Sequence, residues 1–145
     1  MKVSLSWVEK MQFRATAGNH TVSVDAKRPI GDDQGILPKE LLLASMASCT
    51  AMDVAALLRK HKQVLKEFTV AVDATPSEGK HPKVFTQANI TFEISGDVDP
   101  TIALDSVRAS QTVFCGVSAM LSRAFPIHYE VIVNGAPAGT GQAEF

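Results

Sequence analysis

The chain has 145 residues, of which 46% are hydrophobic and 20% charged, a composition typical of a single globular domain spanning residues 1–145. Fourteen Lys and Arg side chains against fifteen Asp and Glu give a net charge of −1, which excludes a strongly basic surface for nucleic acid. Two cysteines are too few for a small secreted domain held together by disulfides.

The N-terminal part is predicted to form a three-stranded antiparallel meander. Polar and apolar residues alternate over residues 2–7, and further short strands are expected at 13–17 and 21–26, with Gly18-Asn19 as a hairpin turn. This start lacks the apolar run of a signal peptide, because Glu9 and Lys10 follow at once. We therefore expect a cytoplasmic protein.

After a loop rich in turn-forming residues, a long helix is predicted from Pro38 to about Lys62. Its longest uncharged run, Leu41 to Met52, is too short to cross a bilayer, which takes about 20 residues, so no membrane segment is expected. Between its charged ends, the helix is apolar or small on every face except at Asp53. Such a helix has to be buried on all sides. We expect either a dimer or a sheet wrapped tightly around the helix.

The second half is predicted to alternate strands and helices. Asp99 and Pro100 are a helix-start signal, and Cys115-Gly116 is expected to interrupt the helical segment that follows. The tail from Asn134 to residue 145 is rich in Gly, Ala and Pro and is expected to be mobile. The whole order is βββ-α-ββ-αα-β, an α+β fold. The expected elements are strands at 68–74, 84–95 and 127–133, and helices from Asp99 past Val113 and at 117–124.

The two cysteines, Cys49 and Cys115, are the residues with the most distinctive chemistry. Free cysteine is often a small buried hydrophobe, so both could be core residues. Alternatively, the fold brings them together as a redox pair, in which Cys49 is oxidised and Cys115 resolves it as a disulfide. Helical N–H groups after Cys115 would lower the pKa of its thiol. Two scattered cysteines with four dispersed histidines have no metal-ligand spacing, so no metal is expected.

Two segments, PKELLLASMASCTAMDV and FCGVSAML, resemble the OsmC/Ohr family, the osmotically inducible protein C and organic hydroperoxide resistance proteins. The first matches the family pattern of a proline-led helix that carries a cysteine, here Pro38 and Cys49. The second matches the second family cysteine. The matching residues are Pro38, Leu41, Ala44 and Cys49 in the first segment and Cys115, Val117 and Ser118 in the second.

The resemblance implies an OsmC-like fold in which antiparallel sheets wrap around long central helices of an intertwined homodimer. It also implies a thiol-dependent peroxidase that uses no cofactor. Cys49 would attack an organic hydroperoxide and become a sulfenic acid, and Cys115 would convert it to a disulfide. A dithiol reductant, either a lipoyl protein or a thioredoxin-like protein, would restore both thiols.

The chain departs from the family pattern at the residues that assist the first cysteine. Family peroxidases use a Glu directly after the proline and an Arg from the N-terminal sheet or its loop. Here Lys39 takes the Glu position with Glu40 one residue later, and the Arg candidates are Arg14 and Arg28. Lys39 could itself supply positive charge.

Asp53 lies one helical turn after Cys49, where it could be a structural acid or could organise a nearby cation. A carboxylate at this position would raise the pKa of the thiol. These departures leave a second function open, an OsmC-like redox-sensing or small-molecule-binding protein with weak or no peroxidase activity.

Overall fold

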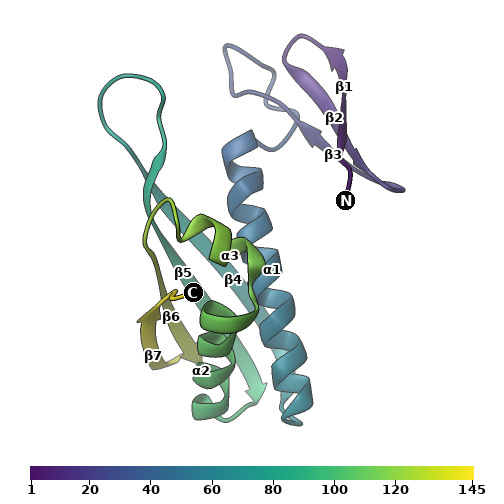
Figure 1. Cartoon of the computed structure of the whole chain (residues 1–145). Helices are drawn as coiled ribbons and strands as arrows, with labels where there is room; N and C mark the ends of the chain where they lie inside the picture. The colour runs from purple at the N-terminus through teal and green to yellow at the C-terminus, as the bar shows by residue number, and fades with distance from the viewer. The chain divides into compact units, whose positions relative to one another are not determined.

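The computed structural model describes residues 1–145 (Figure 1). The chain forms two compact units, Met1–Leu42 and Leu43–Phe145, and each is described by itself. The single domain expected from the length therefore stays a prediction. The elements are β1 (Ser4–Glu9), β2 (Gln12–Ala17), β3 (His20–Val24), α1 (Pro38–Lys60), β4 (Val64–Pro76), β5 (Phe85–Asp97), α2 (Pro100–Ala109), a π-helical turn η1 (Ser110–Phe114), α3 (Gly116–Leu121), β6 (Ile127–Val133) and β7 (Ala136–Gln142).

The N-terminal unit contains the predicted meander. Strands β1, β2 and β3 pair antiparallel in that order, and Gly18 has a positive φ of 58° in the turn between β2 and β3. The loop after β3 is organised by Asp25, which is buried. Its carboxylate accepts hydrogen bonds from the backbone N–H groups of Ala26, Asp32 and Gln34. Three such bonds stabilise the ionised form, so the pKa of Asp25 lies below its ordinary value, the bond from Gln34 contributing most.

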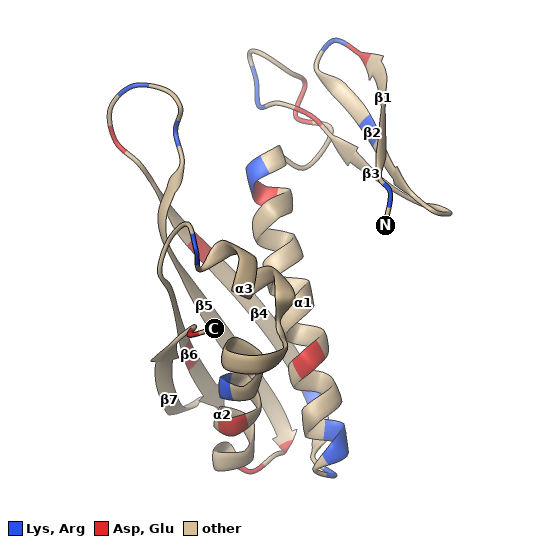
Figure 2. Cartoon of the chain, in the orientation of Figure 1, with Lys and Arg blue, Asp and Glu red and all other residues tan.

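Helix α1 begins at the predicted proline and ends close to the predicted residue. The Glu40 carboxylate accepts a hydrogen bond from the backbone N–H of Leu37 at 3.0 Å, which satisfies one of the free donors at the helix start. Figure 2 shows charged residues near both ends of α1 and one acidic residue between them, at Asp53. Glu40 at the start and Arg59 and Lys60 at the finish match the helix dipole, whereas Lys39 at the start does not.

Buried residues on α1 recur at every fourth position, so one stripe of the helix faces the core. That stripe consists of Met46, Thr50, Val54 and Leu58. By length and composition α1 could cross a membrane, but three of these side chains pack into the hydrophobic core of the second unit. Helix α1 is therefore a core helix. Within one chain, only 22% of the most apolar 18-residue stretch of α1 is buried.

The C-terminal unit contains a four-stranded sheet in the order β4-β5-β6-β7. Strands β4 and β5 form a long antiparallel hairpin, and β6 and β7 form another. The central pair, β5 and β6, is parallel. The expectation of antiparallel sheets is therefore wrong for this one pair of strands. The physical reason is the connection: α2, η1 and α3 cross over between β5 and β6, and parallel strands need such a long crossover.

The expected mobile tail is also corrected, because residues 136–142 form β7. The Asn134-Gly135 pair makes the turn from β6, with positive φ values of 51° and 79°. This pair is a strong hairpin signal. The small residues of β7 allow close packing: a Cβ on Gly139 would lie 2.6 Å from a methyl carbon of Leu104 in α2. Close packing against α2, rather than flexibility, accounts for the glycine at position 139.

The core of the second unit lies on one face of this sheet. Every second residue of β5 and β6 is buried, from Ala88 to Ile94 and from Ile127 to Val133. These side chains pack with the buried stripe of α1 and with Ala103 and Val107 of α2. Figure 1 shows α1 and α2 covering the same sheet face. The observed elements agree with an α+β fold.

Candidate active site

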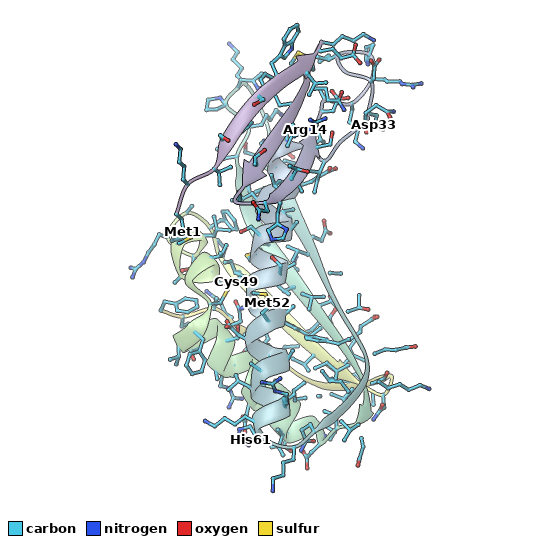
Figure 3. The ribbon with its side chains drawn as sticks, turned by 90° about the vertical axis from the view of Figure 1, so that its right-hand side faces the viewer. Met1, Arg14, Asp33, Cys49, Met52 and His61 are labelled. Carbon is cyan, nitrogen blue, oxygen red and sulfur yellow. The ribbon has the colours of Figure 1, made fainter.

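Cys49 lies midway along α1, as the sequence predicts (Figure 3). Its side chain is half-buried, whereas Thr50 beside it is fully buried and Met52 is 69% exposed. The thiol thus sits at the boundary between the core-facing stripe and the exposed side of the helix. Such a position gives a reagent access to the sulfur while the neighbouring residues remain packed.

Cys115 is positioned by an irregular helical segment. Its backbone N–H donates to the carbonyl oxygen of Ser110 at 2.9 Å, which closes the π-helical turn η1. Cys115 then caps α3, with its sulfur accepting a hydrogen bond from the backbone N–H of Ser118 at 3.4 Å. A π-helical turn inserted into a helix is frequent at functional sites.

The Cys115 thiol is 0% exposed. Burial raises its pKa above the ordinary value, and the adjacent Cys49 raises the pKa further. The hydrogen bonds from Ser118 act in the opposite direction but are weaker than burial. The expectation that helical N–H groups give Cys115 a lowered pKa is therefore wrong. The N–H contact exists as predicted, but the cost of placing a thiolate in the core exceeds it.

Three reactive side chains come together in what we call the thiol cluster, Cys49, Asp53 and Cys115. The two Sγ atoms and one carboxylate oxygen of Asp53 all lie within 4.8 Å of one another. Both cysteines are free thiols. Two thiols this close can form a disulfide after a modest approach, since the S–S bond is about 2.05 Å long.

A buried polar chain supports the cluster from the core side. Gln111 Nε2 donates to Thr50 Oγ1 at 2.9 Å, Thr50 Oγ1 and Ser110 Oγ are 2.8 Å apart, and Ser110 Oγ donates to Asp53 Oδ2 at 3.0 Å. Thr50, Ser110 and Gln111 are all fully buried. The chain ties α1 to the segment that carries Cys115.

Asp53 lies beside Cys49, and its role there stays a prediction, whereas two members of this polar chain are absent from the sequence-based expectations. The Asp53 carboxylate, for which a structural role was one expectation, accepts a hydrogen bond from Ser110 of the same chain. Ser110 and Gln111 have no local motif. The available signal was two polar residues inside an otherwise amphipathic helical segment, directly before the second cysteine.

The other predicted site residues belong to the N-terminal unit. Arg14 is exposed on β2, and Arg28 is exposed in the loop after β3. Lys39 and Glu40 lie in the first turn of α1, where the Glu40 carboxylate holds the helix start. Their roles beside Cys49 stay predictions.

Exposed apolar side chains flank the second cysteine. Val113 and Phe114, directly before Cys115, are 67% and 56% exposed, and Met120 in α3 is 68% exposed.

Two thiols and one carboxylate could also contact a soft metal ion, but structural zinc sites ordinarily have four protein ligands and this cluster has three. Two close thiols without further donors fit redox chemistry better.

Comparison with known proteins agrees with the fold. A curated relative, protein YhfA of Escherichia coli K12, is 29% identical over 136 residues, which cover 91% of this chain and 98% of that protein. Among solved structures, a hypothetical protein from Aquifex aeolicus VF5 superposes with a TM-score of 0.83 at 25% identity, covering 92% of this chain and 95% of that one.

An organic hydroperoxide resistance protein from Elizabethkingia anophelis shares the fold, with a TM-score of 0.65 at 15% identity, covering 92% of this chain and 95% of that one. The family model for OsmC-like protein matches residues 31–130, which include both cysteines. The chain belongs to the OsmC-like protein family.

Proposed function

We propose that this protein is a thiol-dependent peroxidase that reduces organic hydroperoxides through Cys49 and Cys115. The observation that carries the proposal is the thiol cluster. Two cysteines far apart in the sequence have their sulfur atoms within 4.8 Å, one half-buried and one fully buried. This is the arrangement that a peroxidatic and a resolving thiol require, because the first must meet substrate and the second must meet the first.

The proposed reaction has three steps. The Cys49 thiolate attacks the distal oxygen of ROOH, the O–O bond breaks, and the leaving RO⁻ takes a proton to become the alcohol. Cys49 is then a sulfenic acid, which condenses with the Cys115 thiol to give a disulfide and water. A dithiol reductant, either a lipoyl protein or a thioredoxin-like protein, exchanges with the disulfide and is itself oxidised. No cofactor is required.

The surroundings of Cys115 favour an organic substrate over hydrogen peroxide. Val113, Phe114 and Met120 expose apolar surface close to Cys115 in the chain. Burial of an apolar substituent on these side chains would stabilise binding by about 25 cal/mol per Å². The structural relative from Elizabethkingia anophelis, described as an organic hydroperoxide resistance protein, is consistent with that substrate class.

We also propose that two copies form an intertwined homodimer through α1. The side of α1 opposite the core stripe exposes small residues and Met52. The small residues permit close approach of a second helix, and Met52 offers it an apolar contact. A groove of about 610 Å³ runs beside this surface. Its lining residues are Met52, Ala55, Ala56, Arg59, Gln63, Val64 and Leu65.

Met52→Glu tests the dimer. The charge should shift the chain toward monomer in sedimentation analysis, because burial of a Met side chain contributes about 1.5–3 kcal/mol. Met52→Leu, which keeps an apolar side chain, should remain dimeric. A parent protein that sediments as a monomer at all concentrations would exclude this assembly.

A cytoplasmic location is part of the proposal. The peroxidase cycle needs both cysteines to return to free thiols, and the cytoplasm maintains that state. The core position of α1 supports a soluble protein of the OsmC-like type.

The peroxidase test compares the parent with two variants. Reduced protein receives cumene hydroperoxide or hydrogen peroxide with dihydrolipoamide as the reductant, and peroxide loss is followed. The parent should turn over, with the organic peroxide as the better substrate. Cys49→Ser should be inactive, and Cys115→Ser should complete one oxidation and stop at the sulfenic acid. Equal turnover by Cys49→Ser and the parent would refute the proposal.

The raised pKa of Cys115 supports a second candidate, a redox-sensing protein that is oxidised once and reduced slowly. A buried thiol with a raised pKa is a slow partner in thiol exchange. The two functions differ in turnover. A sensor forms the Cys49–Cys115 disulfide with one equivalent of peroxide but shows no sustained consumption with excess dithiol.

A further inference from the structure

The proposed peroxidase uses both thiols of the cluster but assigns nothing to its third member. Asp53 lies one helical turn after Cys49, and its carboxylate is within 4.8 Å of both sulfur atoms. A negative charge beside a thiol opposes formation of a thiolate. The first step of the proposed reaction therefore gives no role to Asp53, so its position beside both thiols requires another explanation.

The buried polar chain fixes how this carboxylate is held. An ionised carboxylate only accepts hydrogen bonds, so the Ser110 hydroxyl must donate to Asp53 Oδ2. The Ser110 oxygen is then free to accept from Thr50, and Thr50 accepts from Gln111 Nε2. Every donor in the polar chain points toward Asp53. This order holds the carboxylate through one oxygen, Oδ2.

The second step of the proposed reaction needs a proton carrier. Cys115 is fully buried and burial raises its pKa, so its thiol carries a proton at neutral pH. When the Cys115 sulfur attacks the sulfenic acid of Cys49, this proton must leave the thiol. The hydroxide released from Cys49 must gain one. Because Cys115 is 0% exposed, bulk water is a poor carrier for this transfer.

We infer that the Asp53 carboxylate is the acid–base catalyst of disulfide closure, accepting the Cys115 thiol proton and delivering it to the hydroxyl leaving from Cys49. This inference rests on the proposed function. The S–H bond of Cys115 and the S–O bond of Cys49 break, while the S–S bond and one O–H bond of water form. The Cys115 sulfur is oxidised, the Cys49 sulfenic sulfur is reduced, and Asp53 returns to its ionised state.

The inference predicts opposite effects on the two chemical steps. Asp53→Asn removes the charge and the base but keeps an oxygen that can accept the Ser110 hydrogen bond. Formation of the sulfenic acid should be at least as fast as in the parent, because that step makes no use of the Asp53 carboxylate as a base. Closure of the disulfide should slow by about 100-fold or more, the usual contribution of a positioned acid–base group. A merely structural role would slow both steps together.

The experiment follows one turnover of the full-length protein. Reduced, EDTA-treated protein is mixed with one equivalent of cumene hydroperoxide and quenched at intervals. Mass spectrometry then measures the dimedone adduct of the sulfenic acid and the disulfide. In Asp53→Asn the sulfenic acid should accumulate, and Asp53→Glu should recover part of the closure rate. The inference is overturned if Asp53→Asn closes the disulfide within threefold of the parent rate.

The pH profile of the parent gives a test that needs no variant. With the Asp53 carboxylate as the base, closure does not depend on the thiolate fraction of Cys115, so its rate should change little between about pH 6 and 8. Direct attack by the small thiolate fraction of Cys115 would instead rise about tenfold per pH unit, and that result in the parent would overturn the inference. A parent that forms no sulfenic acid refutes the proposed function itself, so the two failures are distinguishable.

Discussion

The buried polar chain makes a sharp prediction for stability through Ser110. Its hydroxyl is fully buried and bridges Thr50 at 2.8 Å and the Asp53 carboxylate at 3.0 Å. Ser110→Ala removes both bonds and leaves the Thr50 hydroxyl and one Asp53 oxygen without that partner. A buried neutral group left unpaired costs about 1–3 kcal/mol, and a bond to a charged group contributes about 1.5–3 kcal/mol.

Asp53 is only partly buried, so water offsets part of its loss. We therefore expect Ser110→Ala to lower the free energy of unfolding by about 2–4 kcal/mol. The assay is equilibrium unfolding in urea at one fixed protein concentration, since any dimer makes the apparent stability concentration-dependent. The slope of the transition should stay the same, because the surface exposed on unfolding does not change.

Ser106→Ala is the matched control. Ser106 is also a buried serine, but its hydroxyl donates to the carbonyl oxygen of Ile102 one helical turn earlier. That carbonyl oxygen keeps its helical backbone partner when the hydroxyl is removed. Ser106→Ala should therefore cost less than about 1 kcal/mol. Equal losses for Ser106→Ala and Ser110→Ala would refute the idea that the polar chain contributes specifically.

The further predictions concern three single groups, Cys115, Asp25 and Asp99. In Cys49→Ser, alkylation of Cys115 by iodoacetamide should have its pH midpoint above 9.0, because burial, the main cause of its raised pKa, is unchanged. For the same reason, the stability contributed by the protonated Cys115 should be lost as pH rises from about 9.0 through the pKa of the folded state, and urea unfolding measures that loss. An alkylation midpoint or a stability midpoint below pH 9.0 would contradict these two predictions. Backbone hydrogen bonds lower the pKa of Asp25, so the stability that its carboxylate contributes should be present above pH 3.8 and lost as pH falls through the pKa of the folded state. Asp25→Asn should remove that acid transition in a circular dichroism titration. Asp99→Ala leaves the N–H groups of Thr101 and Ile102 without their side-chain acceptor and should lower the free energy of unfolding by about 0.5–2 kcal/mol, and no change in urea unfolding would contradict that capping role.

Local signals in the sequence were sufficient for most elements. Gly18 at a hairpin, Pro38 at a helix start and Asp99 with Pro100 at another all act within a few residues, so their effect can be inferred without the fold. The tail is the exception, although Asn134-Gly135 is an equally local turn signal. Its small residues were attributed to mobility because α2, which packs on them, is distant in sequence.

The sequence by itself determined that a long apolar helix would carry Cys49 and that Cys115 would cap a later helix, because helix starts, caps and apolar patterns are local properties. Only the tertiary structure decided that the two sulfurs and the Asp53 carboxylate share one cluster, that Ser110 holds this carboxylate, and that β5 and β6 pair in parallel. The first two facts depend on how α1 packs against the segment before Cys115, and the parallel pairing depends on the crossover through α2, η1 and α3. Such packing is set by the shape of the whole core rather than by any short stretch of chain.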